Sequence, residues 1–351
     1  AVFTVANDVN FSAAAATDTT NGITITAAGN AAASTLTGTD QADVITGGDA
    51  GDTLGGDAGN DTITGNGGND TVTGGAGNDT ITAGAGADKI TGGAGNDKMT
   101  GGAGVDQFVA DGGADSIADF GTGGVDKVDI TSGSLAATVS ADYTATAAGD
   151  IDNQVTAANA VFTVANDVDF SAAAATDTTN GITVTAAGNA AASSLTGTDQ
   201  ADVITGGDAG DTLSGDAGDD TLSGNSGNDT ITGGAGADAI TGGAGNDKMT
   251  GGAGVDQFTA DGGADSITDF GTGGVDKVDI TAGTLAATVS ADYTATAAGD
   301  IDNQVTAANA VFTVANDVDF SAAAATDTTN GITITAAGNA AASTLTGTDQ
   351  A

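Results

Sequence analysis

Large apolar residues recur at every ninth position through two long stretches of the chain. In the first stretch they are Ile45, Leu54, Ile63, Val72, Ile81, Ile90, Met99, Phe108 and Ile117, and in the second they are Ile204, Leu213, Leu222, Ile231, Ile240, Met249, Phe258 and Ile267. Most are flanked by threonine, as in Thr80-Ile81-Thr82. This alternation predicts a three-residue strand whose middle side chain points inward, and the glycine-rich residues between strands predict sharp turns.

The nonapeptide that carries this pattern is clearest at 74–82, 92–100 and 242–250. It reads G-G-x-G-x-D-x-U-x, where U is the large apolar residue and the sixth position is aspartate. The sixth-position aspartates run without a gap through both stretches, from Asp43 to Asp115 and from Asp202 to Asp265. A fixed period of this kind predicts a repeat protein in which each repeat packs mainly on its neighbours.

The tandem nonapeptides at 38–118 and 197–268 resemble the RTX (repeats-in-toxin, haemolysin-type) calcium-binding family, and the long array resembles its giant bacterial surface-layer, adhesin and surface-fibril members. The resemblance implies an all-β fold, with blocks of right-handed parallel β-roll (a β-solenoid) that bind calcium and are joined by small β-rich linker elements. The segments 119–130 and 269–280 look like the closing segment that follows such blocks.

A longer period divides the chain into units, because the segment 1–8 returns at 160–167 and at 310–317. The first unit is nine residues longer, which equals one extra nonapeptide. We expect β-rich linker elements that are compact or continue the solenoid without calcium, and we expect the sequence to be a window of a longer array. The predicted order is a linker at 1–37, a calcium β-roll block with its closing segment at 38–130, a linker at 131–196, a second block at 197–280, a linker at 281–346 and the start of a truncated third block at 347–351.

The composition excludes most enzyme chemistry. The chain has 351 residues, a formal net charge of -42, and no Cys, His, Pro or Trp. Every acid is aspartate and every base is lysine, so histidine-based triads, thiol nucleophiles and arginine clamps cannot be built. We therefore expect the protein not to be an enzyme. The charge argues against nucleic acid as a partner, and the lack of an apolar run of about 18 residues argues against membrane insertion.

Stacked aspartates need a cation to be stable. Two nonapeptides are expected to form one 18-residue coil, which places each sixth-position aspartate above that of the next coil. At a spacing of about 4.8 Å, two carboxylates repel by about 3–4 kcal/mol at an effective dielectric constant near 20. Calcium between the coils would turn them into ligands, joined by turn carbonyls, and would reinforce a thin core. Several Ca²⁺ ions per block are the predicted cofactor.

The predicted metal ligands are the carboxylates of the best-formed repeats: Asp61, Asp70, Asp79, Asp88, Asp97, Asp106, Asp220, Asp229, Asp238, Asp247 and Asp256. Turn carbonyls such as those of Gly74, Gly77, Gly92, Gly95, Gly242 and Gly245 would complete the sites. We set apart Asp43, Asp52, Asp115, Asp202, Asp211 and Asp265, because most of their repeats depart from the glycine pattern. These outer repeats are expected to serve as caps.

The resemblance implies an extracellular, calcium-dependent structural protein, which forms a bacterial surface fibre, surface layer or adhesin stalk by self-association. Proteins of the family are typically exported by type I secretion through an uncleaved carboxy-terminal signal, and such a chain would fold once it meets calcium outside the cell. Two alternatives stay open. The blocks could be the secretion and folding region of a larger secreted toxin or hydrolase, or an ice- or mineral-binding solenoid that uses its outward threonine files.

Overall fold

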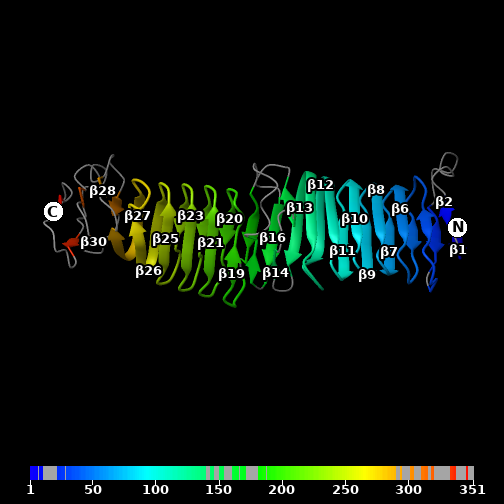
Figure 1. The fold of residues 1–351 in the computed structure, drawn as a ribbon, viewed down its shortest axis with the longest axis horizontal. Helices are drawn as coiled ribbons and strands as arrows, with labels where there is room; N and C mark the ends of the chain where they lie inside the picture. Colours follow the sequence, from blue (N-terminus) through cyan, green and yellow to red (C-terminus); the bar gives the residue numbers. More distant parts are fainter. Residues whose placement is uncertain are drawn as a thin grey trace. The chain divides into compact units, whose positions relative to one another are not determined.

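The structure is a computed structural model, and every element in the residues that it describes is a β-strand (Figure 1). None of these residues forms a helix that could cross a membrane. The described residues are 1–6, 8–10, 22–27, 29–139, 143–145, 150–153, 160–165, 167–170, 181–186, 188–289, 293–294, 301–303, 310–314, 318–319, 333–336 and 345–346. The truncated block expected at 347–351 lies outside them.

The chain forms two compact units, and each is a stack of parallel strands. Unit 1 comprises Ala1–Asn166 and Ala172–Thr183. Its strands are β1 (Val2–Thr4), β2 (Val9–Asn10), β3 (Thr24–Thr26), β4 (Thr35–Thr37), β5 (Val44–Thr46), β6 (Thr53–Ala58), β7 (Thr62–Gly67), β8 (Thr71–Ala76), β9 (Thr80–Ala85), β10 (Lys89–Ala94), β11 (Lys98–Ala103), β12 (Gln107–Phe120), β13 (Lys127–Val139), β14 (Tyr143–Thr144), β15 (Ile151–Asn153) and β16 (Ala160–Val164).

Unit 2 comprises Asp167–Ser171 and Val184–Ala351, and the division falls inside β18 (Thr183–Thr185). Its other strands are β17 (Val168–Asp169), β19 (Ser194–Thr196), β20 (Val203–Thr205), β21 (Thr212–Ala217), β22 (Thr221–Ser223), β23 (Thr230–Ala235), β24 (Ala239–Thr241), β25 (Lys248–Ala253), β26 (Gln257–Phe270), β27 (Lys277–Val289), β28 (Tyr293–Thr294), β29 (Ile301–Asn303), β30 (Ala310–Val314), β31 (Val318–Asp319), β32 (Thr333–Ala336) and β33 (Leu345–Thr346).

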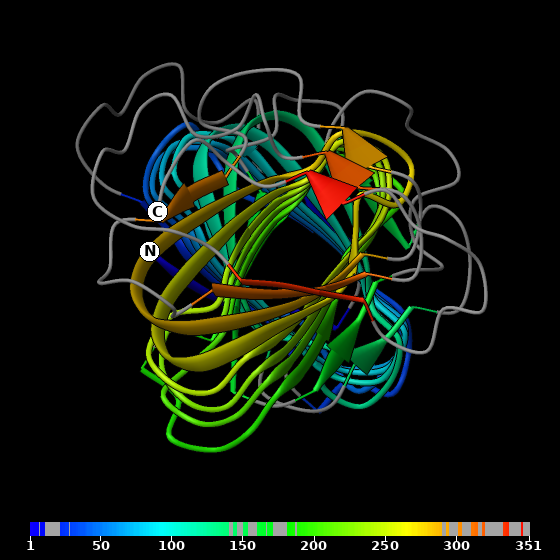
Figure 2. The same cartoon turned by 90° about the vertical axis from the view of Figure 1, so that its left-hand side faces the viewer.

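Neighbouring coils are 18 residues apart, as the nonapeptide period predicts. In unit 1, Ile63 of β7 pairs in parallel with Ile81 of β9, which pairs with Met99 of β11. The alternate repeats form a second ladder, in which Val72 of β8 pairs with Ile90 of β10. Each coil therefore contributes one strand to each of two parallel ladders. Figure 2 shows the coils of unit 2, in yellow-green to orange, lying over one another.

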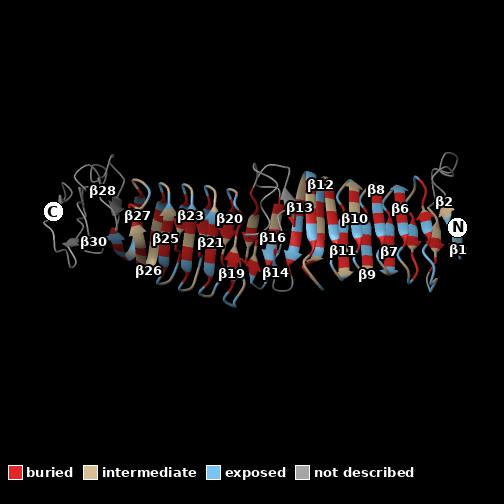
Figure 3. Cartoon of the chain, viewed as in Figure 1, coloured by how far each residue is buried: buried red, intermediate tan, exposed pale blue. Residues whose placement is uncertain are grey.

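The core of each coil is a pair of inward side chains, such as Ile63 and Val72, which are fully or almost fully buried. The threonines on either side of them, for example Thr62 and Thr71, are exposed. Figure 3 shows this alternation as buried and exposed bands across the strands. Together two such side chains contribute about 3–6 kcal/mol of burial per coil. The hydrophobic core of the coils is therefore thin, as the sequence predicts.

Several strands are longer than the three residues expected. Strands β6 to β11 have six residues each, because they extend over the first three positions of the next repeat, of which the second and third pair in parallel. Gly75 pairs with Gly93, and Ala76 with Ala94. A positive φ of 118° at Gly75 bends the strand without breaking this pairing. Only positions 4 to 6 of these repeats remain as the turn. Strands β5, β20, β22 and β24 keep the predicted length.

The closing segment of unit 1, 119–130, connects the long strands β12 and β13, which pair in parallel with register shifts. Gln107 pairs with Lys127, so this coil is 20 residues long instead of 18. The ring of Phe120 lies 5.1 Å from that of Tyr143 and 5.5 Å from that of Phe162, measured between centroids. This aromatic cluster gives the end of the block a larger core than the repeats have.

The described strands of the linkers extend the parallel stack of each unit. In unit 1, β3 pairs with β5 and β4 pairs with β6, so the residues before position 38 join the ladders of the block. At the other end β13 crosses position 130/131 and pairs with β15 and β16. In unit 2, β27 likewise pairs with β29 and β30. These strands correspond to the second form expected for the linkers, a continuation of the solenoid.

Candidate functional site

The sixth-position aspartates form hydrogen-bonded rows along both units. The amide of Asp61 donates to Oδ1 of Asp79 at 2.7 Å, and the amide of Asp79 donates to Oδ1 of Asp97 at 2.8 Å. The same bond, always over 18 residues, begins at Asp43, Asp52, Asp70, Asp88 and Asp97 in unit 1 and at Asp202, Asp211, Asp220, Asp229, Asp238 and Asp247 in unit 2. The stacking of carboxylates predicted from the ninefold period is therefore present.

The local sequence explains why these side chains point into the coil corner. The turn of each repeat ends at position 6, and the next residue starts the strand. Because side chains alternate along a strand, position 7 points outward and positions 6 and 8 point inward. All seventeen predicted ligand aspartates are accordingly buried, with at most 3 % of each exposed.

The second carboxylate oxygen of most of these aspartates has no hydrogen-bond donor. Among the described residues, Oδ2 is buried and unpaired in Asp61, Asp70, Asp79, Asp88, Asp97, Asp106, Asp115, Asp220, Asp229, Asp238, Asp247, Asp256 and Asp265. A buried polar atom without a partner costs about 1–3 kcal/mol, and a charged one costs more. These rows of oxygens therefore indicate a missing positive partner.

A main-chain carbonyl lies beside the unpaired oxygen at six aspartates: Asp61, Asp70, Asp79, Asp220, Asp229 and Asp238. A Cβ atom built on Gly56 would lie 2.1 Å from Oδ2 of Asp61 and 2.4 Å from the carbonyl oxygen of Gly74. The carbonyls of Gly92 and Gly242 approach Asp79 and Asp229 in the same way. Three of the predicted carbonyl ligands, those of Gly74, Gly92 and Gly242, are thus brought to the carboxylate row.

The other three predicted carbonyls face a different neighbour. Those of Gly77, Gly95 and Gly245 each lie against the position-4 glycine of the next coil: Gly95, Gly113 and Gly263. Their role as ligands stays a prediction. Among the described residues, no three acidic side chains converge on one point. An ion in these rows would thus need main-chain oxygens, and a carboxylate with carbonyls is the all-oxygen set that Ca²⁺ prefers.

The first aspartate of each row differs from those that follow. Oδ2 of Asp52 accepts a hydrogen bond from the amide of Gly48 at 2.6 Å, and Oδ2 of Asp43 accepts one from Thr39. Asp202 and Asp211 are satisfied in the same way by Thr198 and Gly207. These four belong to the group that the sequence sets apart, whereas Asp115 and Asp265 of that group keep an unpaired oxygen. Local donors therefore complete the amino-terminal end of each row.

Sequence reasoning missed the aspartates that close one row in each unit. Oδ1 of Asp126 accepts from the amide of Asp106 at 2.8 Å, and its Oδ2 accepts from the amide of Gly121 at 2.7 Å. Asp276 is bound in the same way by Asp256 and Gly271. The signal was available, because Gly121 precedes Asp126 by five residues, as position 1 precedes position 6. Asp126 was missed because it lies two residues beyond the position that the ninefold period gives.

Burial raises the pKa of the stacked carboxyls. It raises the pKa of Asp61 from 3.8 to about 7, with further increases from the carboxylates of Asp79 and Asp43, while the hydrogen bond from the Asp43 amide lowers it. For Asp220 the same causes raise the pKa to about 8. At Asp70 and Asp229 the pKa is raised to about 6. Without a cation, part of each row would take up protons near neutral pH.

Acidification is expected to stabilise the calcium-free protein. A pKa that is higher in the folded chain than the ordinary 3.8 means that protonation favours folding. That contribution is fully present below about pH 4 and is lost as the pH rises through about 6 to 8. Far-ultraviolet circular dichroism in chelator at room temperature should therefore show more β-structure at about pH 5 than at about pH 8, where the calcium-free blocks are expected to be unfolded.

The calcium-loaded protein is the control, and its stability should instead fall as the pH is lowered. Carboxylates must be ionised to bind a metal ion, so acidification releases calcium and lowers the midpoint of thermal unfolding. The same pH dependence of stability with and without calcium would contradict protonation of the aspartate rows.

Outward threonines form a second periodic feature. Thr46, Thr64 and Thr82 are in register on neighbouring coils, and Thr26 extends the file. The parallel file through Thr62 and Thr80 is interrupted by Lys98. Ice or mineral binding by these files stays a prediction.

The nonapeptide blocks match one known protein family. The RTX calcium-binding nonapeptide repeat (4 copies) matches residues 28–63, 55–90, 64–99, 82–117, 187–222, 196–231, 205–240 and 232–267. The matches cover every aspartate with an unpaired Oδ2. No curated protein matches the chain in a sequence comparison.

Proposed function

Both nonapeptide blocks belong to the RTX calcium-binding repeat family, and from this premise we propose that the protein is an extracellular structural protein. In this proposal the chain is a tandem β-roll array that folds on secretion into calcium and forms part of a bacterial surface fibre, surface layer or adhesin stalk. It has no enzymatic activity of its own. The proposal goes beyond calcium binding by a structural repeat, which the family match supports directly.

The rows of buried, unpaired carboxylate oxygens carry the calcium part of the proposal. They lie in the matched repeats, next to main-chain carbonyls, in a chain with 47 acidic and 5 basic residues. The residues that would hold the ions are the thirteen aspartates with an unpaired Oδ2, from Asp61 to Asp115 and from Asp220 to Asp265, together with carbonyls such as that of Gly92. Calcium would supply positive charge between coils that otherwise repel each other.

The dependence on calcium supports folding outside the cell. At the low calcium concentration of the cytoplasm, the carboxylates of the chain would stay solvated and the chain would stay unfolded. An unfolded chain suits export. Extracellular calcium-binding modules bind with dissociation constants of about 10⁻⁴–10⁻³ M, within the range of external calcium. Type I secretion, which is typical of this family, fits this sequence of events.

The repetition of nearly identical units supports the structural role. Segment 1–8 recurs twice, and each complete unit repeats the same closing strands, β12 and β13 or β26 and β27. Solenoids of this kind extend in one dimension, which suits a fibre or stalk. Electron microscopy of the calcium-loaded protein should show filaments or a lattice. Discrete particles at all protein concentrations would contradict the fibre and surface-layer role.

Two substitutions test the assignment of the ion sites. Asp79→Asn removes a carboxylate with an unpaired oxygen, whereas Asp52→Asn changes one whose Oδ2 is already satisfied by Gly48. We expect Asp79→Asn to reduce the number of bound calcium ions, measured by titration calorimetry, and to lower the affinity about tenfold, a cost of about 1.4 kcal/mol. Asp52→Asn should leave the number of ions unchanged. Equal effects would mean that the unpaired oxygens do not mark the sites.

A further inference from the structure

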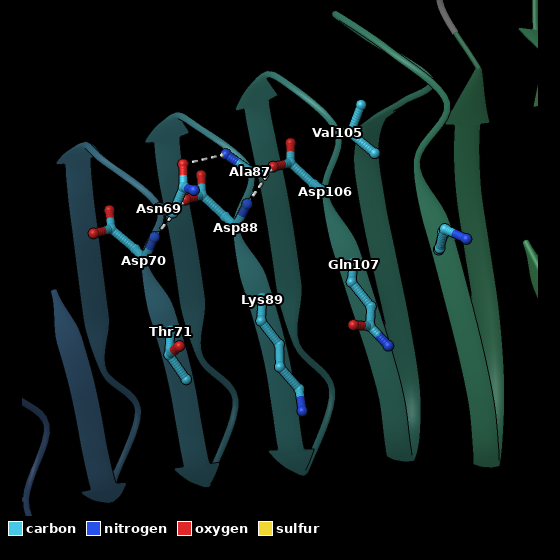
Figure 4. A pocket seen from close by; sticks show the side chains of 10 residues that line it. Asn69, Asp70, Thr71, Ala87, Asp88, Lys89, Val105, Asp106 and Gln107 are labelled. Atoms are coloured by element: carbon cyan, nitrogen blue, oxygen red, sulfur yellow. Dashed lines mark hydrogen bonds between the residues drawn. The ribbon is translucent and has the colours of Figure 1, made fainter. Parts of the chain in front are cut away.

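A groove of about 400 Å³ runs along one outer corner of unit 1 (Figure 4). One wall consists of position-5 residues, Asn69, Ala87 and Val105, and the other consists of position-7 residues of the ladder through β8, β10 and β12. The position-6 aspartates between them point inward, so their main chain forms the floor. The groove therefore lies outside the rows of unpaired oxygens.

Two features of the sequence create this hollow. Position 5 is reduced to alanine at Ala87, although the amide of Ala87 still donates the stacking hydrogen bond to Oδ1 of Asn69 at 3.0 Å. The longer coil between Gln107 and Lys127 then places Lys127 at the end of the groove.

The groove carries positive charge in a strongly acidic protein. Two of the five lysines, Lys89 and Lys127, line it on either side of Gln107 in the same ladder. Lys127 forms an ion pair with Asp150, with 2.9 Å between Nζ and Oδ1. Within the described part of the chain no ion pair involves Lys89, whose side chain is exposed. Lys89 is thus available to a carboxylate from another molecule.

The corresponding corner of unit 2 differs in charge at two positions. In its ladder Thr221 pairs with Ala239, which pairs with Gln257, so alanine replaces Lys89. Asp219 stands where unit 1 has Asn69, and its Oδ1 accepts from the amide of Ala237 at 2.7 Å. Asp219 is exposed, whereas Lys277, next to Gln257 in the ladder, stands where unit 1 has Lys127. The two units therefore differ at this corner by two charges: unit 1 has Lys89 where unit 2 has Ala239, and unit 2 has Asp219 where unit 1 has Asn69.

We propose that Lys89 in the groove of unit 1 binds the exposed carboxylate of Asp219, at the corresponding corner of unit 2, in a second copy of the chain. The contact is heterologous, because different surfaces of the two copies meet, and heterologous contacts extend into open filaments. At physiological ionic strength the Debye length is about 8 Å, so the overall repulsion between copies is screened while a direct ion pair persists. This inference rests on the proposed fibre function and names the contact that builds it.

The two units supply their own conservative substitutions for a test. Lys89→Ala gives unit 1 the residue of unit 2. Asp219→Asn gives unit 2 the residue of unit 1, where Oδ1 of Asn69 accepts the equivalent hydrogen bond. Lys98→Thr is the matched control, because Lys98 lies in the other ladder, in register with Thr80. Self-association would be measured by sedimentation velocity in millimolar calcium, at about 0.1 M and about 1 M salt.

We expect the wild type to associate at the lower salt concentration, and both Lys89→Ala and Asp219→Asn to weaken this association about tenfold, or about 1.4 kcal/mol. Their double variant should be no weaker than either single variant, since both remove one contact. Lys98→Thr should behave as the wild type, and Ala239→Lys should not restore the association that Asp219→Asn loses.

Three results would overturn the proposal. A wild type that stays monomeric in calcium would remove both this contact and the fibre function. Association that is insensitive to Lys89→Ala would remove only the contact and leave the fibre function standing. If Lys89→Ala abolishes binding of a poly-aspartate peptide but leaves self-association intact, the groove takes a carboxylate from another source and the assignment to a second copy is wrong.

Discussion

Removal of calcium with a chelator is expected to unfold both β-roll blocks at room temperature. The two inward side chains of a coil contribute only about 3–6 kcal/mol of burial, so the hydrophobic core of each coil is thin. Each rung also brings two carboxylates together, with a repulsion of about 3–4 kcal/mol, and leaves an unpaired buried oxygen at positions such as Asp79. Far-ultraviolet circular dichroism should show the loss of most β-structure.

Adding calcium or magnesium back to the chelated protein provides the control for this prediction. Calcium should restore the spectrum, and magnesium at the same concentration should restore little of it, because Mg²⁺ requires octahedral geometry and retains its water. Calorimetry should show that the unfolding midpoint rises with calcium concentration, as expected when a ligand binds only the folded state. Unchanged β-content after chelation would refute the assignment of the aspartate rows to calcium.

The substitution Gly77→Ala is expected to be strongly damaging, as at the other position-4 glycines that lie against the neighbouring coil. Gly77 has a φ of 136°, which alanine rarely adopts, and a Cβ there would lie 1.8 Å from the carbonyl oxygen of Gly59 in the neighbouring coil. The contact is with main chain, so it can be relieved only by moving the coils apart, and the aspartate rows would separate with them. We expect a loss on the order of 3 kcal/mol in the free energy of unfolding in calcium.

Gly67→Ala provides the matched control. A Cβ at Gly67 would have no neighbour closer than 3.8 Å, and its partner in the ladder is already an alanine, Ala85. This change should alter the unfolding free energy by less than about 0.5 kcal/mol. Both variants would be compared by thermal or denaturant unfolding in saturating calcium. Similar free energies of unfolding for the two variants would mean that the close stacking of the coils at position 4 does not determine the stability of the fold.

The sequence predicts the coils well because its information is periodic. A single inward residue per repeat, an aspartate two residues before it and glycines in the turn recur together, so the partner of any strand must lie 18 residues away, as Ile63 and Ile81 do. The candidate ligands follow from the same period. Asp126 was not predicted to belong to a row, because the closing coil is two residues longer and this aspartate therefore lies outside the ninefold spacing.

What the sequence by itself determined is the repeat unit, the identity of its inward residues and the stacking of its aspartates, since each follows from local alternation and a fixed period. Only the tertiary structure decided which carboxylate oxygens are satisfied and which are not. Asp52 and Asp79 occupy the same position of the repeat, but the amide of Gly48 reaches Oδ2 of Asp52 and no donor reaches Oδ2 of Asp79. Hydrogen-bond satisfaction depends on the position of donors in space, and the sequence period carries no information about that.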